Sequence, residues 1–410
     1  MIIEEIDYTS YAELLIETGI NLEKGQNLTI RYDINGSLLA RRCAELAYER
    51  GAEIVEMKLN DSHIVKSRVN AQTGDDSALA IAPLWTEAWQ DTVLKEGWGY
   101  LALLSSEDVG LLADCDQNAL MHYHKEQQKK TRRFRDAITG HKISWCVAGV
   151  PGPKWARQVL GKDGSTADLW RILEPILLLD RENPGEAWKE KAAGLIERSD
   201  KLNSLKLDTL HFSDEGTDIT IGLLDTSVWA GGPDNTNGHF TMPNLPTEEV
   251  FTTPDRIRAD GVVHVTRPVE VRGTLVKGAM LTFKGGVLVD FDAEEGRDAL
   301  AGYIETDPGA SRLGEVALVG EDSPIAASGL TFNSILYDEN ASCHIALGSG
   351  YVSCLSNSGE LDSDEKKEEA GCNVSLVHTD FMIGSPSTTV TGICKDGRET
   401  PIIRDGRFVI

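Results

Sequence analysis

Apolar and polar positions along the first half of the chain predict alternating strands and helices. Residues 28–32 and 54–57 have the apolar character of buried strands, and residues 37–51 between them have the spacing of a helix that ends at a glycine. A strand, a helix and a second strand in this order indicate two parallel neighbours in one sheet. Further strands are expected at 100–104 and 143–150, with helical segments between them. The first half therefore has the pattern of an α/β domain.

The pattern changes after a charged helical connector that covers residues 188–203. Residues 205–212 and 218–223 alternate between apolar and polar positions around the turn Asp-Glu-Gly-Thr, which is typical of a β-hairpin. Several more hairpin patterns follow. We therefore predict an α/β N-terminal domain with a mainly parallel sheet over residues 1–203, and a β-rich α+β C-terminal domain over residues 204–410.

Composition indicates a soluble globular protein with an acidic surface. A chain of 410 residues is too long for one ordinary core, and its 41% hydrophobic and 26% charged residues are normal proportions. The formal net charge of −25 would repel phosphate backbones, which argues against a nucleic-acid partner. The same charge favours solubility, and it would also attract metal ions or the ammonium group of a peptide. Charge alone does not choose between these explanations.

Several classes of protein are excluded by what the sequence lacks. No apolar run is long enough to span a bilayer, and residues 1–7 lack the basic and apolar regions of a signal peptide, so we expect a cytoplasmic protein with no membrane partner. The seven scattered cysteines include no Cys-x-x-Cys pair, and they are expected to be small buried residues. The glycine motifs of dinucleotide sites and P-loops and the G-x-S-x-G motif of serine hydrolases are also missing.

Two histidines occur in surroundings that suit a ligand. His378 and Asp380 alternate in a strand pattern, so their side chains are expected on one face, roughly 7 Å apart along the strand. His344 is surrounded by small residues, which leave room around a polar group. Each observation also has an ordinary explanation. The first could be a His–Asp hydrogen bond on a sheet surface, and the second a buried histidine bonded to a carbonyl.

Two acidic segments are the most informative carboxylates. Glu315 lies within the otherwise apolar strand pattern 313–319, and Glu248 and Glu249 lie between apolar residues in the segment 244–251. Lone carboxylates are rarely buried unless they are paired, protonated or bound to a metal. An edge strand or a salt bridge would also explain Glu315.

Two glutamates, two histidines and one aspartate would form a borderline-hard set of ligands that suits Zn²⁺, Co²⁺ or Mn²⁺. One catalytic zinc usually takes three protein ligands and a water, so five ligands fit better with a pair of ions roughly 3.5–4 Å apart. A thiol nucleophile at Cys343 is a weak alternative, because residues adjacent in sequence, here Cys343 and His344, rarely form a nucleophile–base pair.

Five stretches of the sequence together resemble the metallo-aminopeptidase family that includes the bacterial aminopeptidases S and T. Each stretch is weakly specific alone, but they occur in the family's order and span nearly the whole chain. They are Asn-Leu-Glu-Lys-Gly-Gln at 21–26, the segment 244–251 with its Pro-Thr-Glu-Glu-Val-Phe core, Gly-Glu-Val-Ala-Leu at 314–318, the segment 338–348, and Asn-Val-Ser-Leu-Val-His-Thr-Asp-Phe at 373–381.

This resemblance implies a fold, a set of ligands and an assembly. The resemblance implies a homodimer whose subunits have an α/β N-terminal domain and a β-rich C-terminal domain. It also implies that the active sites face an enclosed cavity. Two divalent metal ions per chain, zinc, cobalt or manganese, are implied, together with a catalytic tyrosine at Tyr351. The implied metal ligands are Glu249, Glu315, His344, His378 and Asp380.

The reaction expected from this resemblance is hydrolysis of the N-terminal bond of peptides with a free α-amine, by a hydroxide held between two metal ions. Tyr351 would donate a hydrogen bond to the oxyanion of the tetrahedral intermediate. Glu315 is expected to transfer the proton to the leaving amine, with Glu339 and Glu248 as alternatives. Otherwise, Glu339 is expected to orient His344.

Two other functions are also considered. A different dinuclear hydrolase, such as a phosphoesterase or an amidase, is the first; a phosphoesterase would need basic residues near the metals, and the segments around the expected ligands contain almost none. A non-catalytic, two-lobed metal-binding protein is the second, and it would show no turnover. Among the other histidines, His239 follows a polar loop and is expected near the substrate, whereas His122 and His124 are expected on a solvated helix.

Overall fold

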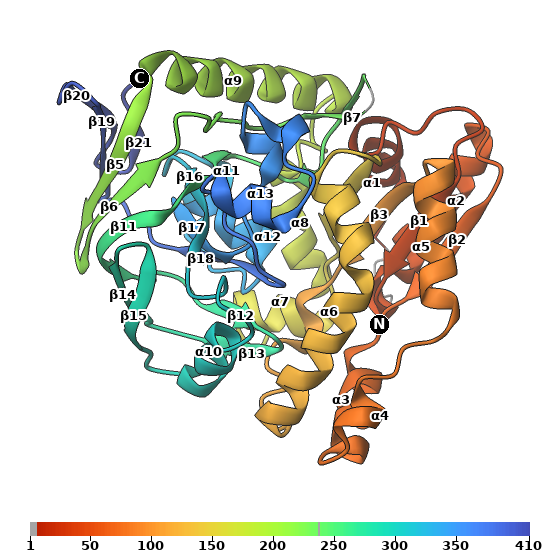
Figure 1. The fold of residues 1–410 in the computed structure, drawn as a ribbon. Helices are drawn as coiled ribbons and strands as arrows, with labels where there is room; N and C mark the ends of the chain where they lie inside the picture. Colours follow the sequence, from red (N-terminus) through yellow and green to blue (C-terminus); the bar gives the residue numbers. More distant parts are fainter. Residues whose placement is uncertain (1–5, 237) are drawn as a thin grey trace.

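A parallel sheet organises the N-terminal half of the protein (Figure 1). The computed structural model describes residues 6–236 and 238–410; residues 1–5, on which part of the expectation about a signal peptide rests, lie outside the described residues. The sheet has the order β2-β1-β3-β4-β9, and all its neighbours are parallel. Its strands are β1 (Leu28–Tyr32), β2 (Val55–Leu59), β3 (Gly99–Leu104), β4 (Trp145–Gly149) and β9 (Asn244–Leu245).

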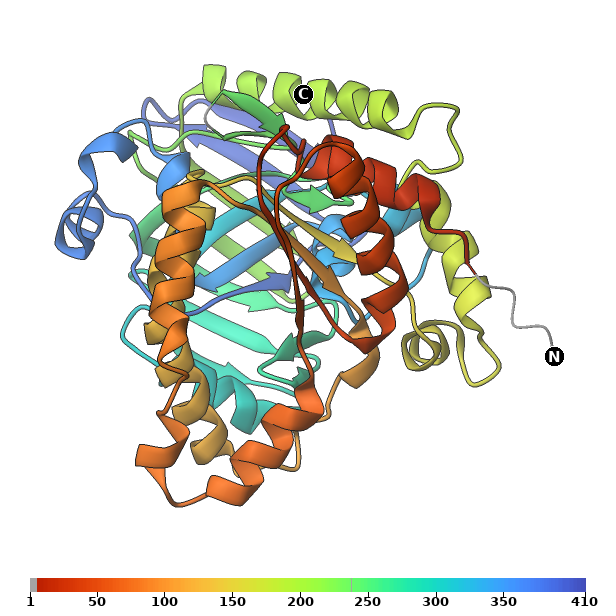
Figure 2. The ribbon, with the colours of Figure 1, turned by 90° about the vertical axis from the view of Figure 1, so that its right-hand side faces the viewer.

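Helices surround this sheet, and the alternation of side chains on its strands explains how they pack (Figures 1 and 2). On β3, Leu101 and Leu103 belong to the large core shared with α1, α2 and α8, whereas Tyr100 packs in a smaller cluster with α5 and α6. The helices of this half are α1 (Thr9–Leu14), α2 (Ser37–Glu49), α3 (Ser62–Gln72), α4 (Asp76–Leu79), α5 (Trp85–Glu96), α6 (Gln117–Thr139), α7 (Pro153–Leu160) and α8 (Thr166–Ile176).

Antiparallel sheets form the rest of the molecule. The largest has eight strands in the order β15-β14-β11-β6-β5-β19-β20-β21, and β5 and β6 form the predicted hairpin. Its strands are β5 (Leu207–Asp214), β6 (Thr217–Leu223), β11 (Pro254–His264), β14 (Met280–Lys284), β15 (Val287–Asp292), β19 (Thr389–Cys394), β20 (Glu399–Arg404) and β21 (Arg407–Phe408).

A second, four-stranded sheet has the order β10-β16-β17-β18. Two small hairpins and four helices complete the C-terminal half of the described chain. The four strands are β10 (Val250–Thr252), β16 (Leu313–Leu318), β17 (His344–Gly348) and β18 (His378–Met382); the other elements are β7 (Asp234–Thr236), β8 (His239–Thr241), β12 (Val269–Val271), β13 (Thr274–Val276), α10 (Arg297–Ile304), α11 (Pro324–Ala327), α12 (Ile335–Asp338) and α13 (Asp364–Glu369).

The two halves are joined by the long helix α9 (Pro184–Leu205), which lies along the top of the molecule in Figure 1. Trp188 and Ala192 of this helix pack in the core of the parallel sheet, and Leu195 and Leu202 pack in the core of the antiparallel sheets. The same apolar face therefore contributes to both cores. The helical connector expected at this point of the sequence is confirmed.

Contacts between the halves are extensive. Strand β9 joins the first sheet although it follows α9 in sequence, and Phe332 and Tyr337 from the C-terminal half pack in the first core. The predicted fold class, an α/β half with a mainly parallel sheet followed by a β-rich half, is confirmed. The division at residues 203 and 204 stays a prediction.

Two further findings concern the whole described chain. None of its helices is both long enough and apolar enough to cross a bilayer. All seven cysteines are free and buried, as expected.

Candidate active site

The four-stranded sheet places three side chains of the candidate site in one row. Glu315 on β16 pairs with Ala346 on β17, and Ala346 pairs with Asp380 on β18. Side chains directly opposite one another in neighbouring strands point to the same face of a sheet. The small Ala346 between the two carboxylates leaves space above the sheet where an ion could bind.

The two histidines lie on the same face, on either side of this row. His344, Ala346 and Gly348 alternate along β17, so they share a face, and Gly348 pairs with His378 of β18. This confirms that His378 and Asp380 occupy alternate positions of one strand. Gly348 adopts a φ of +114°, and a Cβ at this position would come within 2.1 Å of the carbonyl oxygen of Val377. A side chain at Gly348 would therefore push β17 and β18 apart beside His378.

Glu249 reaches the site from the loop that leads into β10. Strand β10 pairs with β16, and the carboxylate of Glu249 approaches the imidazole of His344, with Oε2 and Nε2 3.0 Å apart. The carboxylate of Glu315 lies beside His378, with Oε2 of the glutamate 3.2 Å from Nε2 of the histidine. The neighbouring Glu248 points elsewhere, because its carboxylate forms an ion pair with Lys191 of α9 at 2.5 Å.

These side chains form two groups that could each hold a metal ion, and within each group the ligand atoms lie within 4.8 Å of one another. Glu315 belongs to both groups, so its carboxylate lies between the two positions. The structure thus brings all five predicted ligands together. The first group is Glu249, Glu315 and His344, and the second is Glu315, His378 and Asp380.

Backbone carbonyls orient both imidazoles toward the carboxylates. Nδ1 of His344 lies 3.2 Å from the carbonyl oxygen of Ser342, and Nδ1 of His378 lies 2.7 Å from that of Ser349. A carbonyl can only accept a hydrogen bond, so Nδ1 must carry the proton that is donated. When the imidazole is neutral, Nε2 is then the free ligand atom.

The electrostatics of the site favour cations. Burial raises the pKa of Glu315 to about 7, and nearby carboxylates add to this effect. Burial and neighbouring carboxylates also raise the pKa of Glu339 well above its usual range. Burial lowers the pKa of His344, but its hydrogen bond with Glu249 and the surrounding negative charge outweigh this and raise the pKa to about 9. A divalent cation would compensate these carboxylates and return the imidazoles to their neutral, ligating form.

One carboxylate oxygen of the cluster accepts no hydrogen bond from the described residues. Oδ1 of Asp380 is buried and has no hydrogen-bond partner among the described residues, although Nε2 of His378 lies 3.5 Å away. A buried carboxylate oxygen without a donor is costly unless a cation coordinates it. Carboxylate oxygens together with imidazole nitrogens are suitable ligands for zinc, cobalt or manganese, so the residues fit such an ion.

Tyr351 lies against this cluster just beyond β17. Its ring contacts His378 edge-on, with centroids 4.9 Å apart, and Phe251 of β10, with centroids 5.6 Å apart. Burial and the surrounding carboxylates raise the pKa of the phenol well above its usual range, so the hydroxyl stays a hydrogen-bond donor. The predicted catalytic tyrosine is therefore beside the predicted ligands.

A cavity of about 300 Å³ opens above the cluster and lies between the two halves of the protein. Its lining includes carboxylates but, among the described residues, neither lysine nor arginine. Sequence reasoning missed that the N-terminal half supplies one wall, because no local motif marks residues that face a site built elsewhere. That wall includes Leu104, Thr139, His141, Trp145 and Val147.

Three expectations about other residues are wrong. Glu339 lines the cavity beside Asp380 and does not orient His344, whose Nδ1 faces the carbonyl of Ser342. His239 is exposed and forms an ion pair with Glu23 at 3.1 Å, away from the residues that line the cavity. His124 lies on α6 as expected, but it is largely buried, which lowers its pKa to about 4.

Comparison with known proteins shows the family of this chain. Residues 5–408 match the model of the thermophilic metalloprotease (M29) family. Aminopeptidase AmpS of Bacillus subtilis strain 168 is 36% identical over 403 residues, and aminopeptidase T of Thermus aquaticus is 38% identical over 403 residues; each match covers 97% of both chains. The structure of wild-type AmpT from Thermus thermophilus superposes with a TM-score of 0.85 at 36% identity, over 97% of this chain and 98% of that one. The chain therefore belongs to the thermophilic metalloprotease (M29) family.

Proposed function

We propose that this protein, a metallo-aminopeptidase by its family, removes N-terminal residues from peptides with the help of two divalent metal ions bound side by side. The observation that carries the proposal is the shared position of Glu315, whose carboxylate belongs to both groups of candidate ligands. One ion would be held by Glu249, Glu315 and His344, and the other by Glu315, His378 and Asp380. The ligand set accepts zinc, cobalt or manganese.

The metal ions, when bound, lower the pKa of water to about 7 and polarise a carbonyl oxygen. The residues of the chain supply the rest of the chemistry. Tyr351 donates a hydrogen bond to the oxygen of the scissile carbonyl as negative charge develops on it. Glu315 carries the proton from the attacking water to the leaving amine. Glu339, in the same cavity, is the alternative carrier, whereas Glu248 is engaged by Lys191.

The cavity supports an exopeptidase. Its volume of about 300 Å³ suits the end of a peptide, and Asp234 adds a further carboxylate to those of the candidate ligands. Such a lining attracts the ammonium group that only a free N-terminus carries. A phosphoester is a poorer substrate for the same reason, because the described lining offers no basic side chain to hold a phosphate.

The proposal is tested with peptides on metal-free enzyme that has been refilled with Zn²⁺, Co²⁺ or Mn²⁺. We expect release of the first residue from a peptide with a free α-amine and none from its N-acetylated form. Cleavage of the acetylated peptide at a similar rate would contradict an exopeptidase. Hydrolysis of a phosphate ester instead of either peptide would favour the alternative dinuclear hydrolase, and the absence of turnover with every metal would favour a binding protein.

We also propose that the protein is a cytoplasmic homodimer. Several large apolar side chains of the N-terminal half are exposed, among them Leu84 at 99% and Ile64 at 67%. Leu104, which is 39% exposed, also lines the cavity. Exposed apolar side chains of this size are a common feature of surfaces that bind a second copy, which would bury them. The seven free cysteines agree with a reducing compartment. Sedimentation of a single species with the monomer mass would contradict the dimer.

A further inference from the structure

Three consecutive buried residues lie at the end of α12 and in the turn that follows it, and each has different neighbours. Asp338 and Asn340 are fully buried, and Glu339 lines the cavity. Asp338 packs behind the site, Glu339 faces into it, and Asn340 reaches sideways to the segment that carries Glu249. The metal chemistry uses neither Asp338 nor Asn340.

The carboxamide of Asn340 is bonded at both ends. Its Oδ1 accepts a hydrogen bond from the backbone N–H of Glu248 at 2.6 Å. Its Nδ2 donates to the carbonyl oxygen of Leu336 at 2.9 Å and to Oε1 of Glu339 at 3.3 Å. One side chain thus ties the backbone next to Glu249 to the carboxyl group of Glu339, although 92 residues separate Glu248 from Asn340.

The accepting end controls the first group of candidate ligands. Glu249 lies immediately before β10, which begins at Val250, so the hydrogen bonds of this strand do not include its backbone. The bond from Glu248 to Asn340 therefore holds the backbone immediately before this ligand. Glu249 must stay close to Nε2 of His344, now 3.0 Å away, for both to bind one ion. A shift of the backbone at Glu248 would separate them.

The donating end controls Glu339. The carboxyl of Glu339 lies beside that of Asp380, and each influences the pKa of the other. The Glu339 carboxyl also forms a side-chain hydrogen bond with Asp380. The N–H of Asn340 donates a further hydrogen bond to Oε1 of Glu339, at 3.3 Å.

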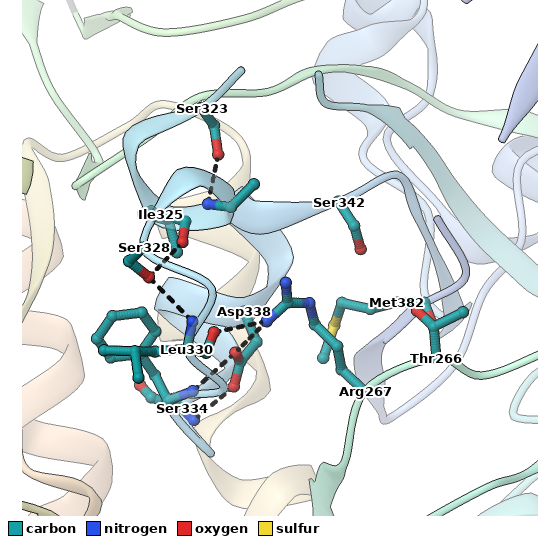
Figure 3. Close-up of polar contacts among 12 residues, drawn as sticks. Thr266, Arg267, Ser323, Ile325, Ser328, Leu330, Ser334, Asp338, Ser342 and Met382 are labelled. Atoms are coloured by element: carbon teal, nitrogen blue, oxygen red, sulfur yellow. Dashed lines mark hydrogen bonds and ion pairs between the residues drawn. The ribbon is translucent and has the colours of Figure 1, made fainter. Parts of the chain in front are cut away.

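The hydrogen bonds of Asp338 hold the segment that carries Asn340, and Figure 3 shows them. The carboxylate of Asp338 accepts the backbone N–H groups of Phe332 at 3.0 Å and Ser334 at 3.1 Å, and faces the guanidinium of Arg267 at 3.3 Å. Arg267 also donates to the carbonyl oxygen of Leu330 at 3.0 Å. A charged, largely buried network of this kind has little freedom to move.

The same anchor extends to the strand of Asp380. Thr266, which precedes Arg267, donates through its hydroxyl to the carbonyl oxygen of Gly384 at 2.8 Å. Its backbone N–H donates to the carbonyl oxygen of Met382 at the end of β18. The segment 338–340 is thereby fixed relative to β18 on one side. Asn340 extends this fixed arrangement to Glu248 on the other side.

We propose that Asn340 is a positioning residue that sets the spacing between Glu249 and Glu339 across the metal site. Its oxygen maintains the affinity for the metal ion at Glu249 and His344. Its amide group holds Glu339 where turnover requires it. The proposal rests on the proposed metal site, and the experiment below separates a failure of one from a failure of the other.

The experiment compares Asn340→Ala, which removes both ends of the carboxamide, with Asn340→Asp, which keeps an oxygen facing the N–H of Glu248 but puts a second oxygen against Glu339. Asn27→Ala is the matched control, because Oδ1 of the buried Asn27 also accepts a backbone N–H, from Ile54 at 2.8 Å, in the N-terminal half. Zn²⁺ affinity is measured on metal-free protein by competition with a chromophoric chelator. Turnover and KM are measured on zinc-saturated protein.

We expect Asn340→Ala to lose roughly 10–100-fold in Zn²⁺ affinity, as for other residues that support metal ligands. Asn340→Asp should keep the wild-type affinity for Zn²⁺ but lose roughly 10–100-fold in kcat at a similar KM. Wild-type affinity and kcat in both variants would overturn the proposal. Equal losses in Asn27→Ala would also overturn it, and so would failure of both Asn340 variants to fold while Asn27→Ala folds, because Asn340 would then serve only the fold. If the wild-type protein itself bound no Zn²⁺, the proposed metal site would fail first.

Discussion

Removal of one hydroxyl group at Tyr351 tests the chemistry of the site with little disturbance of its structure. In Tyr351→Phe the ring keeps its contacts with His378 and Phe251, whose centroids lie 4.9 and 5.6 Å away. The backbone keeps both hydrogen bonds with Thr253, one at 3.0 Å from its N–H and one at 2.8 Å to its carbonyl. The variant should therefore fold and bind metal like the wild type.

Turnover should fall sharply because the hydroxyl is the donor proposed for the developing oxyanion. Loss of one such donor costs roughly 10²–10³ in kcat, which corresponds to about 2.7–4 kcal/mol of transition-state stabilisation. The substrate carbonyl in the ground state gains less from this donor, so KM should change little. The assay is steady-state hydrolysis of an aminoacyl anilide by enzyme saturated with zinc, together with the zinc content of each sample.

The matched control is Tyr11→Phe, which removes a buried hydroxyl far from the candidate ligands in sequence. The hydroxyl of Tyr11 donates to the carbonyl oxygen of Gly149 at 3.0 Å. Its loss leaves a buried acceptor unpaired and should cost about 1–3 kcal/mol in stability, with turnover near the wild-type value. If Tyr351→Phe retained the kcat of the wild type, or lost activity only in proportion to lost zinc, the assigned role of this phenol would be wrong.

Three more predictions follow from particular contacts. Glu248→Gln should bind zinc as tightly as the wild type, whereas Glu249→Gln should lose at least about tenfold in zinc affinity, because only the carboxylate of Glu249 faces the site. Equal affinities of the two variants, measured by chelator competition, would refute the assignment. Arg135→Leu should also weaken zinc binding by about tenfold, because its guanidinium holds the carbonyl oxygen of Leu376 at 2.9 Å just before His378, and an unchanged affinity would show that this contact is unnecessary. Glu270 tests linkage to pH. Burial raises the pKa of Glu270 from 4.5 to about 7. The folded state therefore binds the proton more tightly than the unfolded state, and stability falls by up to about 3 kcal/mol as the pH rises from 4.5 to 7. Glu270→Gln should melt higher than the wild type at pH 8, and an equal melting temperature there would exclude this linkage.

The cost of assembling the site also explains why metal binding and folding should be coupled. Three carboxylates and two histidines are drawn together over one face of a sheet whose side chains are mostly buried. Without a cation, their mutual repulsion and desolvation oppose the folded state. A ligand that binds only the folded protein stabilises it, so metal ions should raise the melting temperature as well as support turnover.

The sequence alone determined those features that depend on neighbours along the chain. Alternation of apolar residues marks the strands of both halves, and the connector at α9 is visible as a charged helical stretch. The isolated Glu315 in an apolar strand marked a carboxylate that needed a partner. The spacing of His378 and Asp380 put both on one strand face. These features can be read locally because strand and helix periods act over a few residues.

Only the tertiary structure decided how these pieces converge. The register of β16, β17 and β18 places Glu315 within reach of both candidate ions, and a register shift by one residue would turn its side chain to the other face. The choice between Glu248 and Glu249 depends on Lys191 in a distant helix. The cavity wall from the N-terminal half and the bond between Asn340 and Glu248 likewise join segments far apart in sequence. Local patterns carry no information about such pairings, because they arise from the packing of separate elements into one molecule.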